Sequence, residues 1–331
     1  MDRVISVAVD LSGSAESFSE KLAGCINAWS AFDNVKLILL GDTSKIKDEI
    51  SSHGADDDRI KLVSASQEIS DTDAPVQTVR DRKDSALVKG LDLVKNGEAG
   101  AFLSGSKARF VNTGAQMILG RIERLSATPM ATLINGRTKH VLLLDSGSMG
   151  VSVKPADLVM FARMASLYMR FLTKEQHPVV GLLSDSIVPE NGGMLYKDAY
   201  ELLKRFREIE FCGTVMPEEI LSGKADIIVC DGFAGSLILN MMSVFSKDIS
   251  TFASVKRKHL FFGKNKETEN ELQFSGPELE GKGITFFPGI QGNVLGMSDK
   301  PYRETVQKAI GYAARLIKED IKGRLISLLR L

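Results

Sequence analysis

The chain has 331 residues, of which 44% are hydrophobic and 25% are charged. This balance is typical of a globular protein and excludes a disordered or fibrous chain. The 42 basic and 42 acidic residues cancel, so no overall positive field would attract nucleic acid, which we exclude as a partner.

The three cysteines, Cys25, Cys212 and Cys230, are far apart and lack Cys-x-x-Cys spacing. This spacing argues against a disulfide framework or a structural zinc site, and we expect neither a metal nor a cofactor. The N-terminus begins as a strand and not as a secretion signal, and no apolar run approaches the roughly 20 residues of a membrane-spanning helix. We therefore expect a cytoplasmic protein, at most peripheral to a membrane.

Short runs of β-branched and aliphatic residues predict strands, and apolar residues at three- and four-residue spacing predict helices. Pro155 is placed to begin a helix, and Asn96-Gly97 to end one. In chain order the predicted elements are strand 4–9, helix 17–32, strands 35–40 and 60–65, helix 87–97, strands 101–104, 130–134 and 141–145, helix 155–172, strand 179–184, helix 197–209, strand 226–231 and helix 301–330.

The near-regular alternation of strand and helix favours an α/β fold with a doubly wound, mainly parallel sheet. Ligands of such sheets bind beyond the carboxyl ends of the strands, so the loops that follow them are the places to seek function. We find no internal repeat or linker, and treat residues 1–331 as a single module that could divide into two lobes. Residues 251–290 interrupt the alternation with a basic cluster and an apolar pair, as expected of a dimer contact, a membrane contact or an exposed corner.

The loop after the first strand, AVDLSGSAES (8–17), opens the first helix with small residues. A helix N-terminus favours an anion, and Ser12 and Gly13 could approach a phosphate. The loop lacks a dinucleotide fingerprint and a Walker lysine, so the alternative is a plain turn with Ser12 or Ser14 as the helix cap.

The segment RDRKDSALVKG (80–90) gathers several cations around Ser85 at a helix start. Arg82 and Lys83 could hold a phosphorylated ligand or an acidic partner protein. The alternative is a solvated charged turn.

Two further small-residue loops, SGSKAR (104–109) and DSGSMG (145–150), also follow strands. Their backbone N–H groups could contact an anion or a carbonyl oxygen, and Lys107 and Arg109 would add positive charge. Taken singly each loop could be structural, but their recurrence at strand ends suggests a shared cleft.

Asp231 closes an apolar run and precedes Gly232 and Gly235 in a turn into a helix. Its carboxylate could orient a ligand, or could cap that helix. Cys230 is interpreted as a core residue, not a nucleophile. No histidine pairs with a serine or cysteine at a recognisable spacing, so a Ser-His-Asp enzyme is disfavoured.

Two stretches carry a resemblance to a known family: DAPVQTVRDRKDSALVKGLDLVKNGEAGAFLSGS (73–106) and CGTVMPEEILSGKADIIVCDGFAGSLIL (212–239). They resemble the acyl-acyl-carrier-protein:phosphate acyltransferases of bacterial phospholipid synthesis, whose fold is similar to that of isopropylmalate dehydrogenases and phosphotransacetylases. The resemblance implies transfer of a fatty acyl group from acyl carrier protein to inorganic phosphate. It also implies a homodimer and cooperation with a membrane-bound glycerol-3-phosphate acyltransferase.

With this resemblance we assign catalytic roles to Asp10, Arg82, Lys83, Ser85 and Asp231. We assign substrate binding to Ser12, Gly13, Ser104, Gly105, Lys107, Arg109, Asp145, Gly147, Gly232 and Gly235.

Several loops depart from the family's pattern. The first loop loses the family's last Asp, and the loop at 104–109 carries Lys107 and Arg109 in place of neutral residues. Two alternatives therefore remain open: a catalytically impaired relative that binds acyl carrier protein or a lipid-synthesis partner, and a short-chain phosphotransacetylase that uses coenzyme A thioesters. A nicotinamide-dependent dehydrogenase is set aside because the chain has no dinucleotide fingerprint.

Overall fold

The computed structural model describes residues 4–55, 58–123, 125–136, 138–147, 153–188, 191, 193–244, 283–298 and 301–330. Its strands are β1 (Ile5–Asp10), β2 (Val35–Gly41), β3 (Ile60–Ser64), β4 (Ala101–Ser104), β5 (Ala131–Asn135), β6 (His140–Leu144), β7 (Val179–Leu183), β8 (Glu210–Val215), β9 (Ile227–Val229), β10 (Ile284–Phe286) and β11 (Asn293–Met297). Its helices are α1 (Ala15–Ala31), α2 (Thr43–Ser52), α3 (Pro75–Asp81), α4 (Ala86–Lys95), α5 (Ala108–Ile118), α6 (Pro155–Thr173), α7 (Met194–Arg205), α9 (Arg303–Lys318) and α10 (Ile321–Arg330), with the 3₁₀ turn η2 (Pro217–Glu219) and helical residues 232–244.

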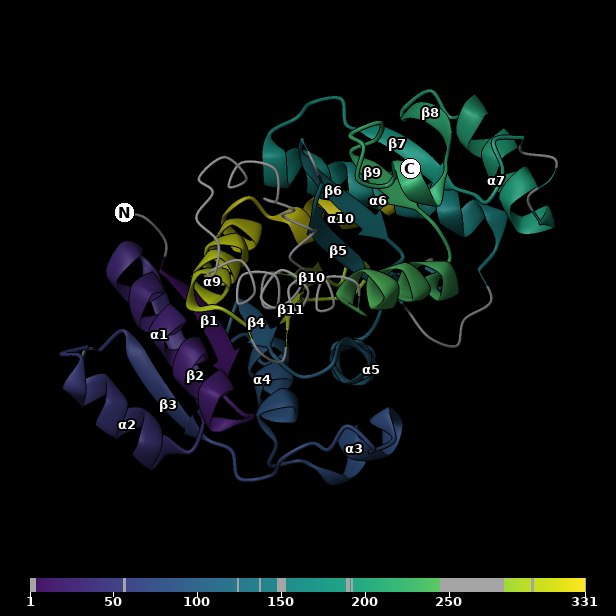
Figure 1. The fold of residues 1–331 in the computed structure, drawn as a ribbon. Helices are drawn as coiled ribbons and strands as arrows, with labels where there is room; N and C mark the ends of the chain where they lie inside the picture. Colours follow the sequence, from purple (N-terminus) through teal and green to yellow (C-terminus); the bar gives the residue numbers. More distant parts are fainter. Residues whose placement is uncertain are drawn as a thin grey trace, which may run out of the picture.

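The sheet order β3-β2-β1-β4-β11-β10-β5-β6-β9-β7-β8 confirms the α/β, mainly parallel prediction (Figure 1). The strands from β3 to β11 are parallel to one another, as are those from β6 to β8. Three antiparallel pairings in the middle, through β10 and β5, reverse the direction between the two sets. The sheet therefore has two parallel halves that run in opposite directions.

The register brings the carboxyl ends of both halves to the same level of the sheet. One row of paired residues joins Val9, Leu103, Leu295, Phe286, Ala131 and Leu144 in that order. Because this row lies at the end of β1 and β4 and also at the end of β6, the loops of both halves face the middle of the molecule. Four strand spacings of about 4.8 Å separate β4 from β6, or roughly 19 Å along the sheet.

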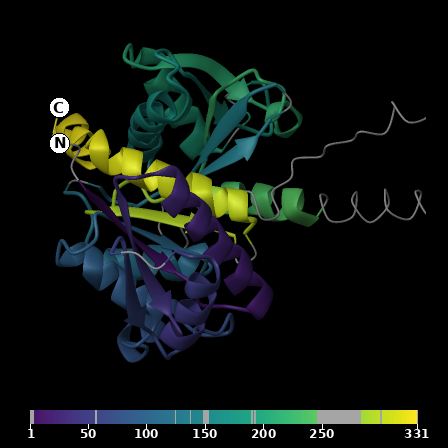
Figure 2. The ribbon, with the colours of Figure 1, turned by 90° about the vertical axis from the view of Figure 1, so that its left-hand side faces the viewer.

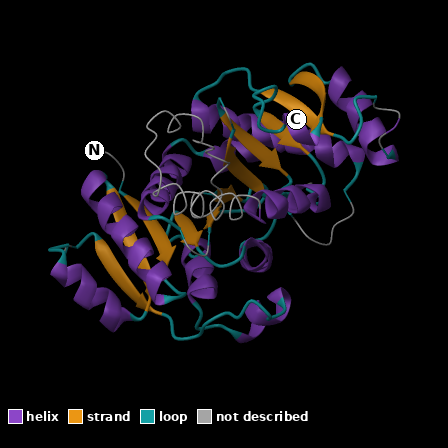
Figure 3. Ribbon diagram, in the orientation of Figure 1, coloured by secondary structure: helices purple, strands orange, loops and turns teal. Residues whose placement is uncertain are grey.

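Helices cover both faces of the sheet (Figure 3). Apolar residues of α1, α6 and α9 pack with β1 and β6 in one core cluster, and those of α4 and α5 pack on the other face of β1 and β4 in a second. A third cluster lies beside β6, β7 and β9. In Figure 2 the elements from β1 to α5 and those from β6 to β9 form two lobes, and α9 and α10 lie between them.

Local sequence signals explain the ends of several helices. Ser14 caps α1, as one alternative anticipated, and Pro155 begins α6. Asn96 ends α4 and Gly97 adopts a φ of +75°, a backbone conformation that favours glycine. These predictions are confirmed.

Other predictions were wrong. The pattern did not predict β8, β10 and β11, which are short or interrupted by glycine. The helix predicted at 301–330 divides into α9 and α10, because Asp320 adopts a φ of +47° between them. Helix α7 ends at Arg205, before the predicted end at 209.

Most of the segment 251–290 lies outside the described residues, which resume at 283. Its last part is not irregular as predicted, because β10 pairs there with β11 and β5 in the centre of the sheet. Among the described residues, no helix is both long and apolar enough to cross a membrane.

Candidate active site

Asp10 joins the first two of the predicted loops. Its fully buried carboxylate accepts hydrogen bonds from Ser12 N (2.9 Å) and Ser12 Oγ (2.5 Å) through Oδ1. Through Oδ2 it accepts bonds from Ser104 Oγ (2.7 Å) and Ser106 Oγ (3.3 Å). Because β1 and β4 are neighbours, one carboxylate thus holds the loops at 12–13 and 104–106 together. We call this set the Asp10 cluster.

Helices α1 and α5 both begin directly after the loops of the Asp10 cluster. Gly13 has a φ of +121°, which lets the chain turn from β1 into α1, and Ser14 Oγ accepts a hydrogen bond from Ser17 N. Two helix N-termini with their positive dipole ends therefore lie at one edge of the sheet, an arrangement that favours an anion.

Lys21 is a charged residue that sequence reasoning missed. It lies on the buried face of α1 with a side chain only 1% exposed, and its Nζ donates to the carbonyl oxygen of Ser12 (2.5 Å). A Cβ added at Gly105 would lie 2.6 Å from this Nζ, so the ammonium is next to both loops. The available signal was the position of Lys21 on the helix face that also carries Ser17 and Cys25, one turn to either side.

Asp145 organises a second set of residues, on the other half of the sheet. Its buried Oδ1 accepts hydrogen bonds from Met130 N (2.9 Å) and Gly147 N (3.0 Å). Gly147 has a φ of +133°, and a Cβ at Gly235 would lie 1.8 Å from the carbonyl oxygen of Asp145. The loop after β6 therefore packs against the backbone of the helical residues 232–244, where only glycine fits.

Asp231 is the N-cap of that helix. Its Oδ1 accepts hydrogen bonds from Phe233 N (2.8 Å) and Ala234 N (2.9 Å), and its Oδ2 accepts one from Tyr196 Oη (2.6 Å). Burial and the neighbouring carboxylate raise the pKa of Tyr196, so the phenol stays protonated and continues to donate. The capping alternative is what the structure contains, and Gly232 is buried in the first turn.

Cys230 is buried, and its Sγ contacts the carbonyl oxygen of Asp145 at 3.3 Å. Burial raises the pKa of its thiol well above the ordinary value. Its interpretation as a core residue is confirmed.

The cations at 80–90 form a third set, at the junction of α3 and α4. Arg82 lies 3.8 Å from Asp73, and Lys83 Nζ donates to the carbonyl oxygen of Val79 (3.0 Å). Ser85 is buried and caps α4, since its Oγ accepts from Val88 N (3.3 Å). The hydroxyl of Ser85 is thus engaged in a structural role.

Lys107 and Arg109 are tied to the loop that precedes α3. Lys107 Nζ forms an ion pair with Asp71 (2.9 Å), and the Arg109 guanidinium donates to the backbone carbonyl of Asp71. Arg109 also lies over the ring of Phe110. Both cations therefore hold α5 against the loop at 70–73.

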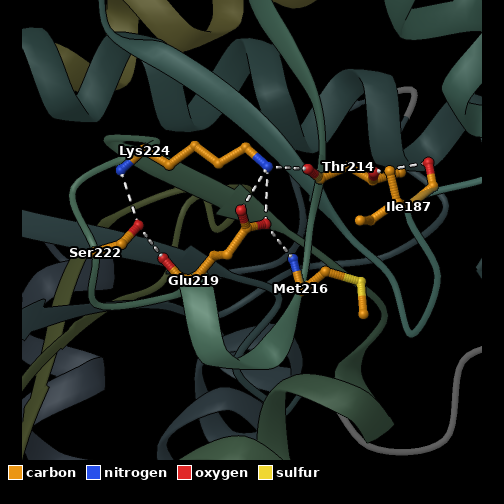
Figure 4. Close-up of polar contacts among 6 residues, drawn as sticks. All are labelled: Ile187, Thr214, Met216, Glu219, Ser222 and Lys224. Atoms are coloured by element: carbon orange, nitrogen blue, oxygen red, sulfur yellow. Dashed lines mark hydrogen bonds and ion pairs between the residues drawn. The ribbon is translucent and has the colours of Figure 1, made fainter.

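The carboxyl end of β8 carries a polar network that shapes the neighbouring loops (Figure 4). Lys224 Nζ donates to both carboxylate oxygens of Glu219 (2.9 and 2.7 Å) and to Thr214 O (3.0 Å). Thr214 Oγ1 in turn donates to the carbonyl oxygen of Ile187 (3.3 Å). This network fixes the turn after β8 and joins it to the loop after β7.

The residues that were expected to share one cleft therefore lie in separate groups. Asp10, Ser12 and Ser104 are in direct contact, with Gly13 and Gly105 beside them. Asp145, Gly147, Gly235 and Asp231 gather on the other half, and the cations at 82, 83, 107 and 109 lie around α3 and the start of α5.

A cavity of about 930 Å³ lies at the opposite end of β1 from Asp10. Ile5, Val35, Leu133 and residues of α9 line it. Hydrogen bonding and charge, and not cavity size, identify the Asp10 cluster as the better candidate for chemistry. The described residues contain no group of three or more His, Cys, Asp or Glu side chains placed to hold a metal ion.

Comparison with solved structures bears out the fold. A phosphotransacetylase from Streptococcus pyogenes superposes with a TM-score of 0.60 at 14% identity, covering 95% of this chain and 94% of that one. A phosphotransacetylase from Staphylococcus aureus gives 0.55 at 17% identity, covering 94% and 93%. At these identities the likeness concerns the fold alone.

Comparison of sequences reaches further. A phosphate acyltransferase of Clostridium perfringens is 33% identical over 328 residues, covering 96% of this chain and 95% of that protein. The phosphate acyltransferase of Clostridium tetani is 30% identical over 332 residues, covering 98% and 99%. A model of the family described as fatty acid synthesis protein matches residues 5–324. The chain therefore belongs to this family, together with the phosphate acyltransferases, and is an acyltransferase enzyme.

Proposed function

We propose that this enzyme transfers a fatty acyl group from its thioester on acyl carrier protein to inorganic phosphate, and so forms an acyl phosphate for phospholipid synthesis. The proposal rests on the arrangement of residues in the Asp10 cluster. There, two small-residue loops at adjacent strand ends are joined by one carboxylate, two helices begin, and a lysine ammonium lies behind the loops.

The reaction needs an anion site and a polar environment for a developing oxyanion, and this arrangement suits both. A phosphate oxygen attacks the thioester carbonyl carbon, and the carbon–sulfur bond breaks as the thiolate leaves. The proton of the attacking phosphate ends on that thiol. Backbone N–H groups and helix dipoles stabilise the phosphate and the transient oxyanion without a covalent enzyme intermediate.

The assigned residues divide between two tasks in this proposal. Asp10, Ser12, Gly13, Ser104 and Gly105 form the phosphate end. The residues around Asp145 and Asp231, across β11, β10 and β5, face the acyl donor. A donor as long as a fatty acyl thioester on a carrier protein could span the roughly 19 Å between the two halves of the sheet.

The cations around α3 and α5 are proposed to contact an acidic carrier protein. Arg82, although within 3.8 Å of Asp73, has a side chain 43% exposed, and Lys107 one 47% exposed. Exposed cations of this kind chiefly steer an acidic partner and accelerate its association.

A homodimer is proposed to form through the helical residues 232–244. Phe233, Leu237, Met241 and Val244 are exposed at the spacing of one helix face, and the helix carries no charged residue. A helix at a membrane surface would be expected to carry cations on its polar face, so a second copy of the chain fits this face better. Passage of the product to a membrane-bound glycerol-3-phosphate acyltransferase, with peripheral membrane association through 251–266, belongs to the same proposal but lies outside the described residues.

The test is the formation of acyl phosphate, trapped with hydroxylamine as the hydroxamate. The purified protein is given long-chain acyl carrier protein, palmitoyl coenzyme A or acetyl coenzyme A, each with and without phosphate. Phosphate-dependent hydroxamate from the carrier-protein donor is expected, with weaker product in Arg82→Ala at limiting donor. Product only from acetyl coenzyme A would favour a short-chain phosphotransacetylase. Binding of carrier protein without product from any donor would favour the catalytically impaired relative.

A further inference from the structure

The largely exposed turn at 70–73 lies against the start of α5. Within the described part of the chain, its polar contacts with other segments all go to cations, namely Lys107, Arg109 and Arg82. Its remaining hydrogen bonds join residues of the turn to one another. Contacts with surface cations therefore supply the polar hold on the turn, and exposed ion pairs contribute little to stability. An anionic ligand would need to replace only these contacts.

Arg109 is only half satisfied by the turn. Its Nη2 donates to the backbone carbonyl oxygen of Asp71, whereas its Nε is buried and has no hydrogen-bond partner among the described residues. The Nε–H and Nη2–H groups lie on one edge of the guanidinium and match two oxygens of a carboxylate or a phosphate. One carbonyl oxygen leaves half of this edge unused, and a buried donor without a partner is unfavourable. The geometry of Arg109 is thus that of a site for an anion with two oxygens.

A negative charge already lies beside this edge. The carboxylate of Asp71 forms an ion pair with Lys107 (2.9 Å), which directly precedes α5 and does not cap that helix with its side chain. The N-terminus of α5 adds the positive end of its dipole. Ser104 and Gly105 of the Asp10 cluster come just before Lys107 in the chain. Asp71 therefore lies where an anionic ligand next to the Asp10 cluster would meet two cations.

We propose that Lys107 and Arg109 bind a phosphate group, and that Asp71 occupies this site until the ligand displaces the turn. In the bound state two phosphate oxygens accept from Nε and Nη2 of Arg109, and the ammonium of Lys107 exchanges Asp71 for the ligand. The phosphate supplies the second oxygen that the turn lacks. This inference rests on the proposed function, in which a phosphate group has two sources: inorganic phosphate as the acceptor, and the prosthetic group of the carrier protein, or coenzyme A, as part of the donor.

Two kinds of variant should give opposite results if the turn competes with the ligand. Lys107→Met removes a charge and Arg109→Lys keeps the charge but loses the paired donors, so both should raise the KM of the phosphate-bearing ligand about tenfold. Asp71→Asn removes the competing charge and should lower that KM about threefold. Lys61 and Glu98 form a comparable exposed ion pair (3.3 Å), so Lys61→Met and Glu98→Gln are the matched controls and should behave as the wild type.

Two donors with the same decanoyl chain identify the source of the phosphate group. The coenzyme A thioester carries phosphate groups, and the N-acetylcysteamine thioester carries none. A change in KM for the coenzyme A thioester but not for the N-acetylcysteamine thioester assigns the site to the donor. A change only in the KM for inorganic phosphate assigns it to the acceptor, and either result supports the proposal. An equal change for the N-acetylcysteamine thioester would show a general disturbance and overturn it.

Calorimetric binding of coenzyme A and of inorganic phosphate gives a readout independent of turnover. If the wild type makes no acyl phosphate but binds either one, and the variants change that binding in the stated directions, the proposed function fails and the phosphate site stands. Whether or not the wild type is active, the proposal is overturned if the folded Lys107→Met and Arg109→Lys variants bind both as tightly as the wild type, or if Asp71→Asn binds neither more tightly. A wild type that binds neither overturns it as well.

Discussion

Replacing Gly235 by alanine tests the packing of the helical residues 232–244 against the loop that follows β6. The new Cβ would lie 1.8 Å from the carbonyl oxygen of Asp145 and 2.9 Å from its carbonyl carbon, whereas such contacts are not seen below 3.0 Å. The backbones must therefore separate by more than an ångström. Asp145 resists this movement because its N–H donates to Cys230 O (3.1 Å) and its side chain holds Met130 and Gly147.

The expected effect combines two opposing contributions. Overpacking a closely packed site costs about 1–3 kcal/mol, and the upper end applies here because the clash is with backbone. Alanine in place of glycine inside a helix stabilises the folded protein by roughly 0.5–1 kcal/mol. We expect the free energy of unfolding of Gly235→Ala to fall by about 2 kcal/mol, measured by urea denaturation followed by circular dichroism.

Asn240→Ala, an exposed position in the same helix, is the control that isolates helix propensity, and it should be neutral or slightly stabilising. Of the two variants, only Gly235→Ala should therefore lose stability. If Gly235→Ala is as stable as the wild type or more so, the close approach of this helix to Asp145 is refuted.

Four further predictions concern polar and titratable groups. Asp10→Asn keeps the shape of the side chain but weakens its hydrogen bonds, and should reduce the free energy of unfolding by about 1–3 kcal/mol in urea; an unchanged value would argue against the carboxylate as the link between the loops. Tyr196→Phe removes the donor to Asp231 and should cost about 1 kcal/mol in the same assay, while circular dichroism should remain native because the helix cap persists. Of the three cysteines only Cys212 is exposed, so at pH 8 a thiol reagent should modify one thiol in the native protein and three in urea. Burial raises the pKa of Cys25 to about 12, so the stability that comes from keeping this thiol neutral is present below the unfolded value near 8.5 and is lost as pH rises above it. A pH titration of unfolding that shows no loss of stability above pH 9 would contradict this cause.

The candidate site was only partly readable from the sequence. Asp10 and the small residues at 12–13 and 104–105 could be found because they follow strands, and ligands of parallel sheets bind there. Lys21 was hidden, since a lysine within an amphipathic helix is usually exposed. Ser85 and Asp231 were assigned catalytic roles, yet their side chains cap helices, and a capping residue and a catalytic residue look alike in the sequence.

By itself the sequence determined the elements with strong local signals, and with them the fold class and the family. Runs such as 101–104 became strands, and Pro155, Ser14 and Gly97 set helix ends, because these preferences depend on a few neighbouring dihedral angles. Only the tertiary structure decided the pairing of β10 and β11 at the centre of the sheet, the reversal between its two halves and the burial of Lys21 between two loops. These features depend on contacts between residues far apart in the chain, which local preference does not specify.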